Sequence, residues 1–285
     1  MIWHCAQHRI NLALRPVVMG IVNVTPDSFS DGGQHANTQA AIAHGMALWA
    51  QGADILDVGG ESTRPGAVPV LEAEELARVL PVVQALAKAG AVVSIDTMKP
   101  AVMIAALAAG ASIVNDVNAL QAQGALEVVA ATGCGVVLMH KQGKPATMQQ
   151  APHYASDDVL SQVKSELAAL RTRAVQGGIG ANRIVIDPGI GFGKTLAHNL
   201  ALVAGIPSLA AVAPLLLGAS RKKLLESITG QPVGERLAAS IGMAVSGVQR
   251  GAAMVRVHDV AQTVDALKVW YAVAQQNARW ESVLV

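Results

Sequence analysis

Short apolar runs recur along the whole chain, and their regular return is the main signal for the fold. Each run is continuous rather than alternating, which is typical of parallel strands that are covered on both faces. The runs are VVMGIV from 17, DILDVG from 54, AVVSID from 91, SIVNDV from 112, GVVLMH from 135, RIVIDP from 183, PLLLGAS from 214 and AMVRVH from 253. Alanine-rich segments with helical spacing lie between them, among them TQAAIAHGMALWAQG, AVMIAALAAG and GERLAASIGMAVSGVQRG. Glycine closes each of these segments near the next run, so strand and helix are predicted to alternate.

The number of these repeats favours a closed barrel over an open sheet. No linker or low-complexity stretch divides residues 1–285, so the sequence predicts an α/β fold with one domain, a (β/α)₈ TIM barrel. A doubly wound open sheet would also alternate, but it usually carries a glycine fingerprint after its first strand. Here that place holds NVTPDSFSDGG. Pro81 is expected to interrupt and kink the second helix.

Composition and charge narrow the range of partners. Apolar residues make up 52% of the chain and charged residues only 14%, which suits a large buried core. A formal net charge of +1 gives no field that would steer the protein toward nucleic acid or a membrane. The chain shows neither a leader-like opening nor an apolar run of membrane-spanning length, so we expect a cytoplasmic protein. Cys5 and Cys134 are too few for a disulfide framework, and Cys134 is expected to be a buried free thiol.

Polar residues gather where the apolar runs end. In a barrel of this kind the active site lies at the C-terminal ends of the strands, so the residues that end each run are the candidates for chemistry. They are Asn23; Glu61, Ser62, Thr63 and Arg64; Asp96; Asn115 and Asp116; His140; Asp187; Ser220, Arg221 and Lys222; and Arg256 and His258. All eight ends contribute, which predicts one polar site at this mouth of the barrel.

Each of these residues also has a structural explanation. Asp96 is explained equally well as the cap of the following helix. Asn115, Arg256 and His258 lie inside apolar runs, and burial without partners would cost each about 1 to 3 kcal/mol. One shared ligand is a better explanation than three separate accidents. His140 is interpreted as a packing residue.

The segment DPGIGFGKT, residues 187–195, resembles a phosphate-binding loop but fails at one position. That motif needs a glycine where Pro188 stands, and proline has no backbone N–H to give to a phosphate. The GxGxG spacing does not fit a dinucleotide fingerprint either. We interpret the segment as a tight, flexible loop that brings Phe192 over the barrel mouth. The sequence contains no HExxH, paired CxxC or GxSxG motif.

Taken together, these segments resemble dihydropteroate synthase, a family of the folate pathway. The resemblance covers nearly the whole chain and is carried, in the family's order, by MGIVNVTPDSFSDGG, DVGGESTRPGA, SIDTMKP, IVNDV, LMHKQGKPATMQ, DPGIGFGK, GASRKK and VRVHDV. It implies a transferase that condenses 6-hydroxymethyl-7,8-dihydropterin diphosphate with p-aminobenzoate to give 7,8-dihydropteroate and diphosphate. It also implies a TIM barrel, a Mg²⁺ cofactor, a homodimer and inhibition by sulfonamides.

The resemblance assigns roles to residues of this chain. Pterin would be bound by Asp96, Asn115 and Asp187 at its donor edge, Lys222 at its carbonyl and ring nitrogen, Arg256 on its face, and Met139 and Phe192 as walls. Diphosphate would be bound by Asn23, Thr63, Arg64, Arg256 and His258, with Asn23 as the metal contact. p-Aminobenzoate would be bound by Thr63, Arg64, Pro65, Phe29, Lys222 and Lys223. The catalytic set implied is Lys222, Arg256, His258, Asp27 and Asp31, the two aspartates lying in a loop over residues 24–33 that closes on the substrates.

Three departures from the family pattern are visible, at Lys141, Ile190 and Lys223, and none of them removes a residue assigned to chemistry. A pterin-binding methyltransferase barrel is the nearest rival, but it would not need SRK, RVH and TPDSFSDGG together. A non-catalytic pterin-binding relative should have lost a loop or diphosphate residue. A nucleotide kinase is disfavoured by Pro188.

Overall fold

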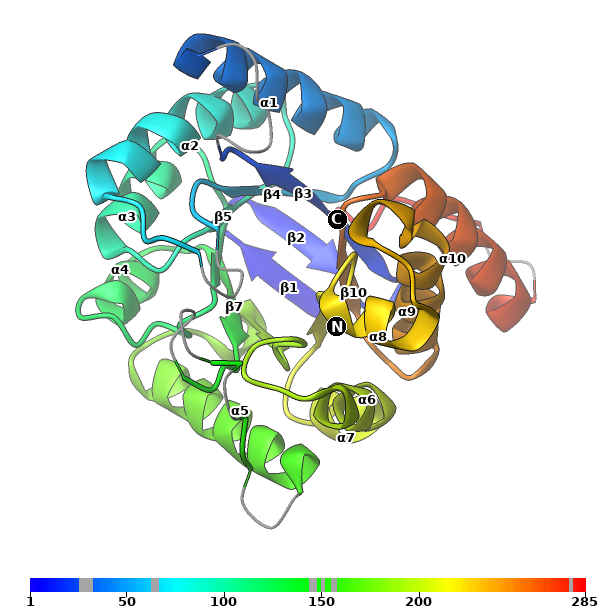
Figure 1. Ribbon diagram of the computed structural model, residues 1–285. Helices are drawn as coiled ribbons and strands as arrows, with labels where there is room; N and C mark the ends of the chain where they lie inside the picture. Colours follow the sequence, from blue (N-terminus) through cyan, green and yellow to red (C-terminus); the bar gives the residue numbers. More distant parts are fainter. Residues whose placement is uncertain (26–32, 63–66, 144–147, 150–151, 155–157, 277–278) are drawn as a thin grey trace.

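Eight parallel strands form the core of the computed structural model, and helices surround them (Figure 1). The structure describes residues 1–25, 33–62, 67–143, 148–149, 152–154, 158–276 and 279–285. The strands are β3 (Val17–Asn23), β4 (Ile55–Gly59), β5 (Val93–Asp96), β6 (Ile113–Asp116), β7 (Gly135–Met139), β8 (Ile184–Asp187), β9 (Leu216–Leu217) and β10 (Met254–Val257). Each coincides with one predicted apolar run. The order is β8-β7-β6-β5-β4-β3-β10-β9, and a parallel bridge between Ile186 and Leu215 joins the two ends. The predicted (β/α)₈ barrel is confirmed.

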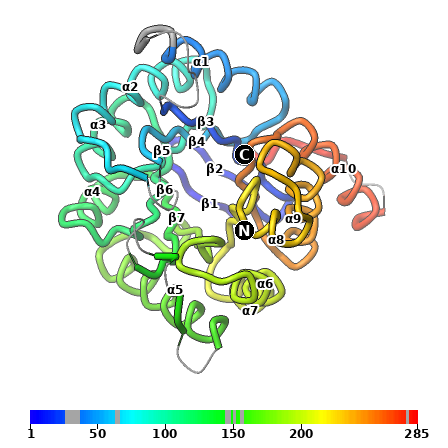
Figure 2. Tube along the Cα trace, viewed as in Figure 1, coloured from blue at the N-terminus to red at the C-terminus, as the bar shows by residue number. Residues whose placement is uncertain are grey.

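The helices follow the strands in turn around the outside of the ring (Figure 2). They are α1 (Gly33–Ala50), α2 (Glu72–Lys88), α3 (Pro100–Ala108), α4 (Ala125–Ala131), α5 (Val159–Gln176), α6 (Leu196–Ala204), α7 (Ile206–Ala210), α8 (Lys223–Thr229), α9 (Leu237–Gln249) and α10 (Val260–Gln275). The expected interruption of the second helix is wrong, because α2 continues through Pro81. Pro81 is exposed, so the carbonyl that loses its intrahelical donor there can be hydrated instead.

The strands divide their side chains between two environments. Successive residues of a strand point to opposite faces, and here the outward residues pack with the helices while the inward ones meet inside the barrel. The first inward layer is apolar and fully buried: Met19, Ile55, Val92, Ile113, Val137, Val185, Leu216 and Met254. This layer, which we call the floor, supports whatever lies above it toward the C-terminal ends of the strands.

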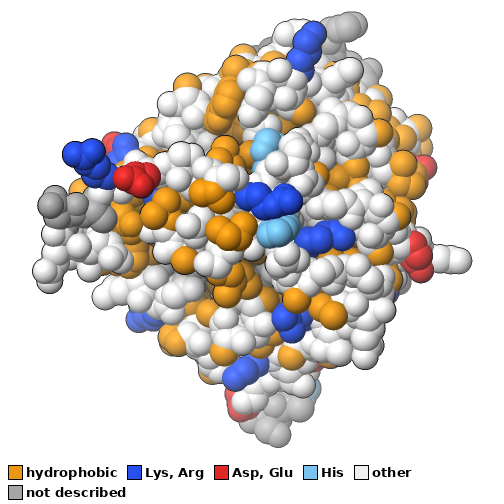
Figure 3. All heavy atoms as spheres, turned by 180° about the vertical axis from the view of Figure 1, so that it is seen from behind, with side chains coloured by type: hydrophobic (Ala, Val, Ile, Leu, Met, Phe, Trp, Pro, Cys, Tyr) orange, Lys and Arg blue, Asp and Glu red, His pale blue; other side chains and the backbone are white. Residues whose placement is uncertain are grey.

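An N-terminal hairpin that the sequence analysis did not predict closes the barrel below the floor. Its strands are β1 (Ile2–Cys5) and β2 (His8–Asn11), paired antiparallel, and Figure 1 shows them behind the barrel opening. Trp3, Cys5 and Ile10 belong to the same buried cluster as the floor. Figure 3 shows the molecule from behind, where Lys, Arg and His side chains gather near the middle of the face. Strands β1 and β2 were not predicted because polar residues interrupt the apolar pattern in both of them.

The two cysteines lie in this lower part of the molecule. Cys5 and Cys134 are both buried free thiols, as expected for Cys134. Burial is the main cause that raises the pKa of the Cys5 thiol. The described residues contain no helix that is long and apolar enough to cross a membrane.

Replacing the main side chain of the hairpin should destabilise the whole barrel. Trp3 is 1% exposed and its Nε1 donates to the carbonyl of Arg183 at 2.8 Å. Trp3→Ala is expected to lower the free energy of unfolding by about 3 to 5 kcal/mol in urea denaturation, because it leaves a cavity under the floor. Trp3→Phe is the matched control, and should cost only about 1 to 3 kcal/mol for the carbonyl left unpaired. Equal stability of Trp3→Ala and the wild type would show that the hairpin does not support the barrel.

Candidate active site

The inward layer above the floor is largely polar. Two residues beyond each floor position the side chain points inward again, and these positions hold Ile21, Asp57, Ser94, Asn115, Met139, Asp187, Gly218 and Arg256. Two residues further, at the mouth, come Asn23, Asp96, Ser220 and His258. Most of the predicted site residues that the structure describes therefore occupy two successive levels of the same barrel interior. Strand periodicity brings them together from six different strands.

Arg256 is the centre of the charge network in this layer. Its Nε donates to Asp57 Oδ2 at 2.6 Å, and its Nη2 donates to Asp96 Oδ2 at 2.7 Å. Burial lowers the pKa of Arg256, but Asp57 and Asp96 raise it by more, so the guanidinium stays charged. Asn115 is 5% exposed, and its Nδ2 donates to the same Asp57 oxygen at 2.9 Å. The polar residues inside the apolar runs are thus partners of one another.

Asp96 does not cap the helix that follows it. The residue before α3 is Lys99, and the bond of Asp96 goes across the barrel to Arg256. Burial raises the pKa of Asp96 to about 7, against the lowering effect of Arg256 and with the help of Asp57. Asp96 is therefore a carboxyl group that can exchange a proton near neutral pH.

Asp187 and Lys222 face each other across the opposite side of the layer. Asp187 Oδ1 accepts from the backbone N–H of Gly189 at 2.7 Å, so part of the carboxylate does stabilise the loop. Burial raises the pKa of Asp187, which Lys222 lowers, and burial lowers the pKa of Lys222 to about 8. An added Cβ at Gly218 would lie 3.5 Å from Asp187 Oδ2 and 3.9 Å from Lys222 Nζ. The missing side chain of Gly218 thus leaves room beside both groups.

The glycine loop is as tight as predicted. Gly189, Gly191 and Gly193 have φ of 66°, 83° and 68°, a region that glycine adopts at no steric cost. A Cβ at Gly189 would lie 1.8 Å from the carbonyl oxygen of His140. Lys222 Nζ donates to the carbonyl of Ile190 at 2.6 Å and lies 4.7 Å from the centre of the Phe192 ring. The loop therefore places an aromatic ring next to the ammonium group of the site.

A hydrogen-bond network of the buried Lys194 and His140 with the exposed Glu166 holds this loop from behind. Lys194 Nζ donates to His140 Nδ1 and to the carbonyl of Phe192, both at 3.0 Å, and His140 Nε2 lies 2.9 Å from Glu166 Oε2. His140 is 2% exposed, in keeping with its interpretation as a packing residue. Burial lowers the pKa of His140 to about 4 and that of Lys194 to about 7. His140 is therefore neutral, and it accepts from the ammonium group at Nδ1. Met139 is buried inside the barrel on the same strand.

Asn23 and His258 stand at the mouth of the barrel. Asn23 ends β3 and is half-buried. His258 Nδ1 lies 3.1 Å from the hydroxyl of Ser220. Lys223 is exposed and begins α8, whereas Arg221 is paired with Asp259. These residues form a rim around the polar layer.

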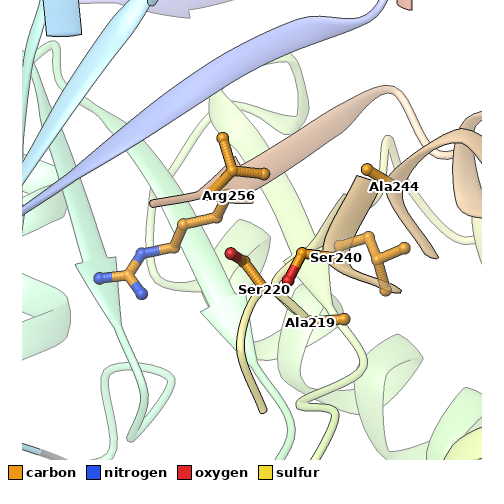
Figure 4. A pocket seen from close by; sticks show the side chains of 7 residues that line it. Ala219, Ser220, Ser240, Ala244 and Arg256 are labelled. Atoms are coloured by element: carbon orange, nitrogen blue, oxygen red, sulfur yellow. The ribbon is translucent and has the colours of Figure 1, made fainter. Parts of the chain in front are cut away.

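A small space lies behind Arg256, on the side of α9. Figure 4 shows Ser220, Ser240, Ala219 and Ala244 around it, while the side chain of Arg256 runs away from Ser240 and Ala244. The space has no room for a water molecule. It is a packing gap next to the site and not a substrate pocket.

Six of the predicted site residues lie outside the described residues. They are Asp27, Phe29, Asp31, Thr63, Arg64 and Pro65, and their assignments stay predictions. The last three of them belong to the segment 63–66. Just before this segment, Glu61 is paired with Lys99, which is also paired with the buried Glu75. The last described residues before this gap are therefore tied to α2 and to the segment after β5.

Asp57 is the residue that the sequence analysis missed. It is completely buried in the middle of an apolar run, and no polar neighbours marked it. The signal was the strand period, because Asp57 stands two residues after the inward Ile55 and two before the end of its strand. Its Oδ1 and the hydroxyl of the neighbouring Ser94 have no hydrogen-bond partner within the described ranges.

Few of the described side chains are placed to act as ligands of a magnesium ion. Over the part of the chain that the structure describes, no group of three His, Cys, Asp or Glu residues is placed to hold a metal. Mg²⁺ commonly takes only one or two protein ligands and completes its shell with water and substrate phosphates. Asn23 ends β3 at the mouth and is half-buried, and its side-chain carbonyl oxygen suits such an ion.

Comparison with known proteins places the chain in a family. Residues 19–258 match the model of the family described as pterin binding enzyme. The dihydropteroate synthase of Escherichia coli strain K12 is 47% identical over 270 residues, which cover 93% of this chain and 95% of that protein. The dihydropteroate synthase of Neisseria meningitidis serogroup B is 48% identical over 279 residues, which cover 95% and 97%.

Solved structures agree with this match along the whole fold. The Yersinia pestis dihydropteroate synthase in a sulfonamide drug complex superposes with a TM-score of 0.91 at 44% identity, covering 96% of this chain and 100% of that one. The Xanthomonas albilineans enzyme with 4-aminobenzoic acid gives 0.90 at 50% identity, covering 96% and 98%. The Burkholderia cenocepacia enzyme with 7,8-dihydropteroate gives 0.87 at 44% identity, covering 96% and 97%. The chain therefore belongs to the family of pterin-binding enzymes.

Proposed function

We propose that the polar layer of the barrel binds the pterin of 6-hydroxymethyl-7,8-dihydropterin diphosphate and holds its methylene carbon ready for p-aminobenzoate. The activity is that of a dihydropteroate synthase, a transferase that forms 7,8-dihydropteroate and releases diphosphate. One observation carries the assignment of residues. Carboxylates, an amide and two cations converge in the upper part of the barrel interior, and Asp187, Lys222 and Arg256 border the space left by Gly218.

The chemistry of the layer matches that of a pterin ring. The aminopyrimidinone edge presents N–H donors, for which Asp96, Asn115 and Asp187 offer acceptors, while the ring carbonyl and ring nitrogen accept from Lys222. Arg256 can stack on the face of the ring. Met139 and Phe192 provide the apolar walls. A dry site of this kind makes each mismatched polar pair costly, which gives specificity.

The reaction needs positioning and charge more than a nucleophile from the protein. The bond between the methylene carbon and the diphosphate oxygen breaks, the electron pair leaves with diphosphate, and the pterin ring stabilises the resulting cation. The amine of p-aminobenzoate then forms the new C–N bond and loses a proton. Arg256, His258 and Asn23 are placed to meet the leaving group. When bound, Mg²⁺ supplies neutralising charge for that diphosphate, with Asn23 as the protein ligand.

The second substrate is assigned to the rim. Lys222 and the exposed Lys223 at the start of α8 are proposed to meet p-aminobenzoate. The remaining contacts of that substrate are proposed for residues outside the described part of the chain. A homodimer is proposed from the family resemblance. A cytoplasmic location is proposed because the two cysteines, Cys5 and Cys134, are free thiols, which fits a reducing compartment.

Asp187→Asn distinguishes a ligand-binding carboxylate from a loop residue. The amide oxygen can still accept from the N–H of Gly189, so the melting temperature without ligand should stay at the wild-type value. The amide NH₂ would face a pterin N–H donor, which should cost about 2 to 4 kcal/mol, or roughly 30-fold to 1,000-fold in pterin affinity. Isothermal titration with the free hydroxymethyl-dihydropterin measures this. Normal pterin binding by the variant would remove Asp187 from the site.

The pH dependence of pterin binding should have an acid and an alkaline limb. Asp96 must be ionised to accept, and its pKa of about 7 means that affinity falls as the pH drops below 7, by about tenfold per unit. Lys222 must be protonated to donate, and its pKa of about 8 means that affinity also falls above 8. Titrations of the diphosphate-free pterin between pH 5.5 and 9.5 check both limbs. Asp96→Asn should abolish the acid limb, and an unchanged acid limb in that variant would refute the assignment.

The raised pKa of Asp96 affects ligand binding and protein stability in opposite directions as the pH rises. The pKa of Asp96 is raised above its unfolded value of about 4, so its stabilising effect is present below pH 4 and is lost as the pH rises through 7. The ligand-free protein should therefore gain from Asp96→Asn at pH 8 relative to pH 5, measured as the difference in melting temperature between variant and wild type. A difference that does not change with pH would show that Asp96 has an ordinary pKa.

Product formation is expected to need a divalent metal. Excess chelator should stop diphosphate release, and added Mg²⁺ should restore it. Asn23→Ala should weaken binding of the pterin diphosphate more than binding of the diphosphate-free pterin, because only the former brings the metal. Equal losses for both ligands would make Asn23 a structural residue.

A further inference from the structure

Asp57 binds two groups of the pterin site at once. It lies on β4 and is fully buried, and its Oδ2 accepts from Arg256 Nε at 2.6 Å and from Asn115 Nδ2 at 2.9 Å. These donors come from β10 and β6, which each lie two strands away from β4, one in each direction around the barrel. A single carboxylate oxygen thus sets the position of a proposed stacking group relative to a proposed edge-binding group. Asp57 lies on the same inward level as both donors, two residues beyond the floor residue Ile55 on β4.

Arg256 makes two hydrogen bonds to carboxylates, and a bound pterin can replace only one of them. Its Nη2 donates to Asp96 Oδ2 at 2.7 Å, and Asp96 is the carboxylate proposed to accept from the pterin edge. Its Nε contact is with Asp57, which has no exposed surface and lies at the deeper level. When the ring N–H approaches Asp96, it can replace Arg256 Nη2 as the donor to this carboxylate. The contact with Asp57 leaves the guanidinium paired throughout, which avoids a buried charge without a partner.

We infer that Asp57 is a positioning residue, which anchors Arg256 through Nε so that Asp96 can turn from the guanidinium to the pterin ring without Arg256 leaving the ring face. The inference rests on the proposed function, because it takes the pterin-binding roles of Asp96 and Arg256 from it. Asp57 touches neither substrate nor reacting atoms in this scheme. It acts on the substrate through Arg256.

The charge of Asp57 also acts on Asp96. The pKa of Asp96 is raised by burial first, and then by the carboxylates Asp57, Asp116 and Glu75, while Arg256 lowers it. Removing one of these negative charges lowers the pKa of Asp96. A variant without the Asp57 charge should therefore bind pterin down to lower pH than the wild type, although more weakly. General destabilisation of the barrel would not move this limb.

Asp57→Asn tests the anchor, because the amide has a similar shape but no charge. We expect the KM for pterin diphosphate to rise about tenfold or more and kcat to fall, with the KM for p-aminobenzoate changing by less than about threefold. The acid limb of pterin binding should shift to lower pH. Asp116→Asn is the matched control, since Asp116 is an equally buried carboxylate on the next strand but one, and it binds only the backbone N–H groups of Asn118 and Leu120. The control should lose stability and keep the wild-type KM for pterin diphosphate. Its acid limb should also shift, because Asp116 raises the pKa of Asp96 too, so the KM is the measurement that separates the two variants.

A double-mutant cycle shows whether Asp57 acts through Arg256. Lysine keeps the charge of Arg256 but lacks Nε, so Arg256→Lys already breaks the anchor. Adding Asp57→Asn to that variant should then change the KM for pterin diphosphate by less than about twofold. Independent, multiplying effects of the two changes would overturn the inference.

The outcomes separate the inference from the proposed function. If the wild type releases no diphosphate from pterin diphosphate and p-aminobenzoate, the proposed function is wrong. If it does, but Asp57→Asn behaves like Asp116→Asn, only the positioning role is wrong. Should Asp57→Asn fail to fold, a crystal structure of the wild type with hydroxymethyl-dihydropterin decides. The Nε–Asp57 bond should remain at about 3 Å while Nη2 and Asp96 separate beyond about 3.5 Å, and a guanidinium that leaves Asp57 would overturn the inference.

Discussion

The two-residue period of the strands is the constraint on which this molecule depends. In a closed barrel every second residue of every strand must point into the same narrow interior. One level of that interior is the apolar floor, and the next holds Asp57, Asn115, Asp187 and Arg256. No polar residue at this level can avoid the others. The hydrophobic layers on both sides of the strands fix the register, and the register alone brings together side chains that are up to 199 residues apart in sequence.

Charge balance follows from this geometry. A carboxylate in such an interior needs a cation or several N–H donors, and here Arg256 serves both Asp57 and Asp96, while Lys222 lies close to Asp187. Burial still leaves Asp96 with a pKa near 7 and Lys222 with one near 8. Groups with opposite shifts of this kind, close together in one barrel interior, are typical of binding and catalytic sites.

The sequence was sufficient for the barrel and for much of the site, but in unequal ways. Runs such as RIVIDP and AMVRVH are continuous and apolar, so each of the eight strands was predicted in place. Residues that end a run, such as Asp187, stood out because the C-terminal ends of the strands are where a barrel of this kind places its active site. Asp57 did not, because a buried residue inside DILDVG shows no contrast until the inward face is known. The hairpin of β1 and β2 was missed because neither strand contains a continuous apolar run. Its stability comes from packing under a floor that only the closed barrel provides. Pro81 is tolerated because its side of α2 faces water.

The polar layer also explains why the site should be less stable without its ligand than with it. Asp57 Oδ1 and the hydroxyl of Ser94 are buried without a partner among the described residues, and such groups cost about 1 to 3 kcal/mol each. Asp96 adds a carboxyl that resists ionisation where it is placed. These costs can be tolerated because the floor, the helix layer and the hairpin stabilise the barrel independently of the mouth. A ligand that brings an N–H donor to Asp96 offsets part of the cost of ionising that carboxyl, so its binding free energy includes the relief of a cost that the empty barrel carries. The same feature that weakens the empty barrel therefore makes it selective for a flat ring rich in donors.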